Sequence, residues 1–84
     1  MLHVAVISPE RTLFEGEASS VIAPAHDGEV GILTGHAPMM ALLGNGQLRV
    51  TSGGGERRFS VTGGFLQVVD DQVRVVTEQA KEEG

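Results

Sequence analysis

Three histidines are the residues of this chain best suited to chemistry near neutral pH, because imidazole can act as a general base or a metal ligand. His36 lies in the stretch DGEVGILTGHAPMM, between a glycine and an alanine-proline pair. His3, His26 and His36 are separated by 23 and 10 residues, without an H-E-x-x-H pattern or other close ligand spacing. This spacing disfavours a metal site and leaves the role of His36 open.

Carboxylates and serines give no stronger catalytic pattern. Glu15 and Glu17 alternate onto one face of a predicted strand, and Asp70 and Asp71 lie in a predicted turn, so both pairs are expected to be solvated. No serine lies in a G-x-S-x-G elbow, and Lys81 does not follow a glycine-rich phosphate loop. The sequence therefore predicts no catalytic residue, no metal and no cofactor.

Length and composition narrow the remaining classes of protein. The chain has 84 residues, enough for a single domain, and it contains no cysteine for disulfides or thiolate metal sites. Its formal charge of −5 disfavours nucleic acid and anionic lipid as partners. No apolar run approaches the length of roughly 18 residues that a membrane span requires, and no signal-peptide pattern is present. We therefore expect a soluble binding protein.

Short apolar or alternating runs, separated by glycine, proline and aspartate, predict an all-β fold. The runs are LHVAVI, TLFEGEA, SSVIAPA, EVGIL, MMALL, QLRVTS, RRFSVT, FLQVV and VRVVT. Gly44-Asn45-Gly46 predicts a tight turn between two paired strands. The predicted fold is a small β-sandwich or flattened barrel of about ten short strands without a substantial helix. It spans residues 1–78, and residues 79–84 have no apolar face and are predicted to be a short, frayed, solvated tail.

Two predicted strand regions carry apolar residues on both faces, although a strand in a two-layer sandwich needs only one apolar face. Alternate positions of LHVAVI and FLQVV already supply one such face, and Ile7, Phe65 and Val69 add apolar side chains on the other, with Val76 nearby. Surplus apolar surface marks a protein interface, but scattered surface valines are also ordinary. Both interpretations stay open from the residues alone.

Two motifs resemble the epsilon subunit family of bacterial and chloroplast F-type ATP synthases. GEVGILTGHAP is similar to the family's G-E-x-G-I-x-x-G-H-A-P, and TGGFLQV is similar to S-G-G-F-x-E-V, with threonine and glutamine replacing the usual serine and glutamate. The resemblance extends from Val6 to about Ala80. It implies a ten-stranded sandwich at the foot of the rotor stalk, a non-catalytic subunit that couples proton-driven rotation to ATP synthesis elsewhere.

The resemblance also implies partners, surfaces and a location. The implied partners are the gamma subunit, the c-ring and, indirectly, the alpha/beta catalytic head. The location is peripheral, on the cytoplasmic face of a bacterial plasma membrane or the stromal side of a thylakoid, without direct membrane insertion. The implied c-ring-facing loop contains Gly28, Glu29 and Gly31. The implied turn facing gamma and the rotor contains Gly35, His36, Ala37 and Pro38. The candidate apolar patch for gamma contains Ile7, Phe65 and Val69.

One departure from the family pattern concerns inhibition. Family members usually continue into a two-helix domain that can restrain ATP hydrolysis and binds ATP in some members, whereas this sequence stops at Gly84. If these residues are the complete product, we expect coupling and assembly without that inhibition and without a nucleotide site. The alternative functions are a free-standing sandwich that binds a small ligand or a metal, and a small β-rich hydrolase.

Overall fold

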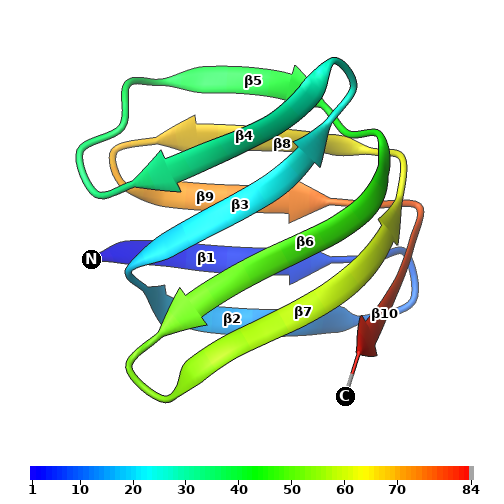
Figure 1. Cartoon of the computed structure of the whole chain (residues 1–84), viewed down its shortest axis with the longest axis horizontal. Helices are drawn as coiled ribbons and strands as arrows, with labels where there is room; N and C mark the ends of the chain where they lie inside the picture. Colours follow the sequence, from blue (N-terminus) through cyan, green and yellow to red (C-terminus); the bar gives the residue numbers. More distant parts are fainter. Residues whose placement is uncertain (84) are drawn as a thin grey trace.

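The computed structural model describes residues 1–83 of the chain. These residues form ten short strands joined by turns, without a helix (Figure 1). The strands are β1 (Leu2–Ile7), β2 (Thr12–Ala18), β3 (Ser20–Ala25), β4 (Gly28–Leu33), β5 (Met39–Leu42), β6 (Asn45–Ser52), β7 (Gly55–Thr62), β8 (Phe65–Val69), β9 (Gln72–Val76) and β10 (Gln79–Glu83). The all-β prediction is confirmed, and the short run MMALL is a strand as expected.

The strands form two five-stranded sheets packed face to face. We name them sheet A, in the order β2-β1-β9-β8-β5, and sheet B, in the order β10-β7-β6-β3-β4. Paired neighbours are antiparallel with one exception, because β1 and β9 run parallel in the middle of sheet A. Figure 1 shows sheet B crossing obliquely in front of sheet A. The sandwich class predicted from the sequence is therefore confirmed.

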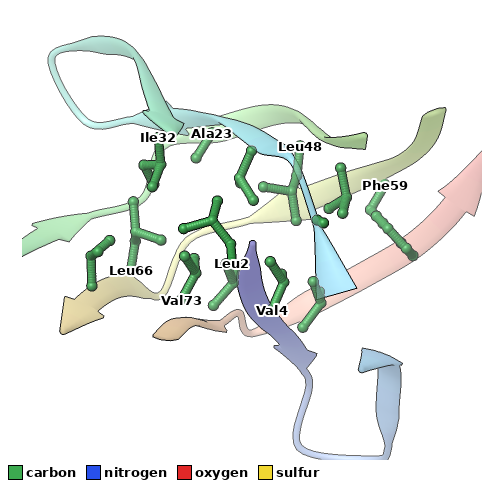
Figure 2. Close-up of a cluster of buried hydrophobic side chains, with 14 of the residues drawn as sticks. Leu2, Val4, Ala23, Ile32, Leu48, Phe59, Leu66 and Val73 are labelled. Atoms are coloured by element: carbon green, nitrogen blue, oxygen red, sulfur yellow. The ribbon is translucent and has the colours of Figure 1, made fainter. Parts of the chain in front are cut away.

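The core fills the space between the two sheets. Alternate residues of each inner strand point inward, so that Leu2 and Val4 from sheet A meet Leu48 and Phe59 from sheet B (Figure 2). All four side chains are fully buried. Burying an aliphatic or aromatic side chain of this size contributes about 1.5–3 kcal/mol, so this shared layer stabilises both sheets together. The alternation of LHVAVI and FLQVV separates two apolar faces on each strand, and the structure shows that Leu2 and Val4 of β1 and Leu66 and Val68 of β8 point inward.

The end of the chain differs from the predicted frayed tail. Residues 79–83 form β10, which pairs antiparallel with β7 from Gln79 opposite Thr62 to Glu83 opposite Arg58. Backbone pairing needs no apolar side chain, and only Ala80 packs against the core, which explains why the hydrophobic pattern missed this strand. Most side chains of β10 are exposed, and Gly84 lies outside the described residues.

The Gly44-Asn45-Gly46 segment is not the predicted hairpin turn. It joins β5 of sheet A to β6 of sheet B, so it forms a corner between layers. Asn45 has no positive φ, and Gly46 is required for space instead, because a Cβ there would lie 2.9 Å from the Cβ of Pro24. The glycines therefore allow the start of β6 to pass close to the end of β3 at this corner.

A second corner, Gly63-Gly64, leads from β7 in sheet B to β8 in sheet A. Both residues have positive φ, 64° and 106°. A Cβ on Gly64 would overlap the carbonyl oxygen of Val76 and lie 2.7 Å from the Cα of Thr77. This position requires glycine for both conformation and space, which accounts for the double glycine of the TGGF motif without a ligand.

Candidate protein-docking face

The outer face of sheet A carries a continuous row of apolar side chains across four strands. The strand register places Leu42 of β5 beside Phe65 of β8, Phe65 beside Val76 of β9, and Val76 beside Ile7 of β1. We name these four residues the apolar row. Their sequence neighbours Leu66, Val75 and Val6 are buried in the core, so the row points away from it.

The apolar row is only partly covered by the chain itself. Leu42 is 67% exposed, and Ile7, Phe65 and Val76 are half-buried by their neighbours in the sheet. Met40, two residues before Leu42 and on the same face of β5, is 66% exposed. Exposed apolar side chains gathered on one sheet face are typical of a surface that another protein covers.

A polar groove lies beside the apolar row on the same face. It has a volume of about 330 Å³ and is lined by Gln67, Val69, Asp70, Gln72 and Arg74, the residues that we name the polar groove. Arg74 pairs with Gln67 across β8 and β9, and Gln72 pairs with Val69. Among residues 1–83, Arg74 makes none of the side-chain ion pairs within 4.0 Å. The groove thus presents an unpaired cation next to apolar surface.

The predicted gamma-facing patch is divided between these two features. Ile7 and Phe65 both belong to the apolar row, in which Val76 lies between them. Val69 is on the same outer face and 42% exposed, but it lines the polar groove. Sequence reasoning did not place Leu42 or Arg74 at this face, because the order of the strands in a sheet leaves no signal in local alternation.

The residues assigned to a c-ring-facing loop lie in a strand. β4 contains Gly28, Glu29 and Gly31, which pair in register with β3. This strand is one edge of sheet B. Only His26 and Asp27 form the turn before it. Glu29 is exposed and accepts a hydrogen bond at 3.3 Å from the guanidinium of Arg49. The carboxylate predicted to meet a basic partner therefore already has one within the sheet.

The turn that contains His36 lies at the opposite end of β4 from Gly28 (Figure 1). Gly35 has φ of 84°, and its N–H donates to the carboxylate of Asp71 at 2.7 Å, which ties this turn to the β8–β9 turn. The Nδ1 atom of His36 lies 2.7 Å from the carbonyl oxygen of Ala37. Because a carbonyl only accepts, Nδ1 must carry the hydrogen in this contact.

The predicted candidates for metal binding, the three histidines, are not brought together with acidic residues among the described residues. Within residues 1–83, no three histidine, cysteine, aspartate or glutamate side chains are grouped so that they could hold a metal ion. His3 lies 3.5 Å from Glu15 on the outer face of sheet A, where both side chains are more than half exposed. The described residues also contain no helix long and apolar enough to cross a membrane.

A charged cluster closes the side of the sandwich where β10 lies. The guanidinium of Arg57 is 5.1 Å from the ring centre of Phe14 and 5.6 Å from that of Phe59. It donates two hydrogen bonds of 2.7 Å to Glu82. These hydrogen bonds lower the pKa of Glu82 and raise the pKa of Arg57 from their usual values. The arrangement attaches β10 to the sandwich, so its role is structural.

Comparison with protein families gives one match that spans the described chain. The sequence profile of the family described as "ATP synthase, Delta/Epsilon chain, beta-sandwich domain" matches residues 1–83. The ATP synthase epsilon chain of Leptospira borgpetersenii is 44% identical over 77 residues, which cover 92% of this chain and 61% of that protein. The epsilon chain of Frankia casuarinae is 42% identical over 81 residues, which cover 95% of both chains.

Solved structures agree with the sequence comparison. A chain in the Euglena gracilis mitochondrial ATP synthase, in a structure of OSCP, F1 and c-ring, superimposes with a TM-score of 0.88 at 25% identity. The match covers 96% of this chain and 52% of that one. A chain from the central stalk and c-ring of the Tetrahymena thermophila enzyme shares the fold, with a TM-score of 0.80 at 18% identity. The chain spans about 60% of the length of several curated relatives that it matches.

Proposed function

The chain belongs to the β-sandwich domain family of ATP synthase delta and epsilon chains, and we propose that it is a non-catalytic subunit of the rotor stalk. In this role it binds the gamma subunit on one side and the c-ring on another, so that rotation of the ring is transmitted to gamma. It forms and breaks no covalent bond itself. ATP synthesis takes place in the alpha/beta head, which the chain contacts only indirectly.

The apolar row on the outer face of sheet A is the single observation that carries this proposal. A sandwich that functions alone has no need of apolar side chains on an outer face, where they contact water. Leu42, Phe65, Val76 and Ile7 form such a surface at one end of the strands, running from the edge strand β5 to β1, and we assign it to gamma. Covering it removes apolar area from water and supplies the main driving force for docking.

The c-ring is assigned to the region around β4 and the turn that follows it. Glu29 is exposed on this edge strand. The Gly35–Pro38 turn follows the other end of β4, and its residues are exposed except for the half-buried His36. The Glu29 carboxylate at this edge adds electrostatic complementarity to a basic or polar partner. Its ion pair with Arg49 orients the carboxylate in the free chain. Through this assembly the chain is peripheral to a membrane, on the cytoplasmic face in bacteria or the stromal side of a thylakoid.

The test is recovery of the complex from the organism's own membranes. The chain is tagged, membranes are solubilised in mild detergent, and co-purifying proteins are identified by mass spectrometry. We expect gamma with alpha, beta and c subunits. A matched strain that carries Val76→Asp should lose gamma, whereas Ser60→Asp, on the outer face of sheet B, should retain it. Recovery of the unmodified chain without any of these subunits would contradict the proposed function.

A further inference from the structure

Arg74 is distinguished from the arginines of sheet B by its lack of a partner within the described chain. Arg49 pairs with Glu29 at 3.3 Å, Arg57 with Glu82 at 2.7 Å and Arg58 with Glu56 at 2.6 Å. Arg74 lies in β9, with the amide side chain of Gln67 beside it and Ala5 on its other side. Asp70 lines the same polar groove but lies beyond ion-pairing distance from Arg74.

The position of Arg74 links it to the apolar row. It precedes Val76 by two residues on the same face of β9, a separation of about 6.6 Å along the strand. Any segment broad enough to cover Val76 and Phe65 therefore also reaches Arg74 and removes water from it. A guanidinium that loses its water without gaining a partner is strongly unfavourable, so a partner that fits this face must supply an acceptor.

The chemistry of the polar groove selects the acceptor. A guanidinium presents two parallel N–H groups, which match the two oxygens of a carboxylate. Gln67 and Gln72 line the groove on the same face, and their amide groups can donate to the same oxygens. The groove carries one arginine and one aspartate in a chain of net charge −5, so an acidic partner is drawn to Arg74 by this specific contact and not by a general attraction to the chain.

We propose that the polar groove binds an acidic side chain of the gamma segment that covers the apolar row, with its carboxylate on Arg74. This inference rests on the proposed function and specifies the partner segment. That segment carries aliphatic or aromatic side chains against Ile7, Val76, Phe65 and Leu42. The same segment also carries an aspartate or glutamate, placed opposite Arg74, about 6.6 Å along β9 from the apolar contact with Val76. The apolar contacts supply affinity, and the ion pair fixes the orientation of gamma on the sheet.

The experiment measures the affinity of the purified chain for the gamma subunit of the same organism by calorimetry at two salt concentrations. We expect Arg74→Glu to weaken binding by about 100-fold and Arg74→Gln by about 10-fold. Arg58→Glu, on the outer face of sheet B, is the matched control and should change affinity less than about 2-fold. Thermal melts of both Arg74 variants should match the wild type, because the side chain is exposed.

A charge swap identifies the acidic partner. Each acidic residue on the gamma surface is replaced by lysine, and one such variant should restore binding to Arg74→Glu while weakening binding to the wild type. If wild-type chain binds gamma and Arg74→Glu behaves like Arg58→Glu, the acidic contact is overturned and the proposed function stands. If wild-type chain does not bind gamma at all, both fall together.

Discussion

The outer faces of the two sheets differ in how far their side chains find partners within the chain. On sheet B, charged and polar side chains pair with one another: Arg49 with Glu29, Arg58 with Glu56, and Gln47 with Glu83 at 2.6 Å. On sheet A, the apolar row and Arg74 find little to pair with inside the chain. Most charged groups of sheet B find partners within it, although Leu33 is 64% exposed on its outer face and the Nε atom of Arg49 has no partner in the described chain. We infer from this difference that sheet A is the side that docks.

The largest expected effect is on the free energy of unfolding, when the Gly63-Gly64 corner that joins the two sheets is altered. Replacing Gly64 by alanine places a Cβ against the Val76 carbonyl, in a backbone conformation that side chains rarely adopt. We expect the free energy of unfolding to fall by about 3 kcal/mol or more, measured by thermal and denaturant melts. Gly54→Ala, where a Cβ meets nothing within 4 Å, is the control and should stay within about 0.5 kcal/mol. Equal stability of the two variants would contradict this account of the corner.

The next largest effect is on the affinity for gamma, and it distinguishes the outer face of sheet A from that of sheet B in folded variants. Val76→Asp places a charge in the middle of the apolar row, and we expect it to cost about 2–3 kcal/mol of binding free energy to gamma. Ser60→Asp puts the same charge on sheet B and should leave the affinity unchanged. Titration calorimetry measures both, and circular dichroism checks that each variant is folded. A loss of affinity with Ser60→Asp alone would reverse the assignment of the faces.

A smaller effect concerns the ion pair that attaches β10. The hydrogen bonds from Arg57 lower the pKa of Glu82 in the folded chain, so its contribution to stability is present above the usual glutamate pKa of about 4.3. It is lost as pH falls through the lower folded-state pKa. Glu82→Gln should therefore melt at a slightly lower temperature than wild type at pH 7, with the difference shrinking as the pH falls below about 4.3. A difference that grew in acid would have the wrong sign.

The smallest effect is expected for a charge on sheet B. The Nε atom of Arg49 is buried without a hydrogen-bond partner in the described chain, and its contact with Glu29 is largely exposed. Arg49→Met removes a weak pair together with an unsatisfied group, so we expect the free energy of unfolding to change by less than about 1 kcal/mol. Affinity for gamma should also stay the same. A large loss of gamma binding would show that sheet B takes part in docking.

The sequence predicted those features that local patterns encode. Alternation showed that β1 and β8 carry apolar side chains on both faces, with Ile7 and Phe65 on the faces opposite Val6 and Leu66, but not which face points inward. It could not show that Leu42 and Val76 complete the row, because that requires the strand order β1-β9-β8-β5. Nor could it find β10, whose side chains are almost all polar and whose stability comes from backbone pairing with β7.

The glycine-rich segments show the same limit from another side. Gly63-Gly64 adopts positive φ, a conformation that glycine accepts by its own nature. Gly44-Asn45-Gly46 instead needs glycine because Ala25 and Pro24 pass close by, a tertiary fact that a local turn signal does not contain. The placement of Gly28, Glu29 and Gly31 in an edge strand has the same origin, since pairing with β3 decided it.

The parallel pairing of β1 with β9 has a consequence for how the molecule is made. His3 lies beside Gln72 and Ile7 beside Val76, so β1, which pairs with the adjacent β2 early, finds its second neighbour only after residue 76 has been synthesised. Closing so long a loop is slow relative to the formation of hairpins, which places completion of sheet A late in folding. Because the apolar row crosses that junction, a prematurely terminated chain lacks it. If gamma docks on this face as proposed, it would therefore bind only chains in which β9 has already paired with β1.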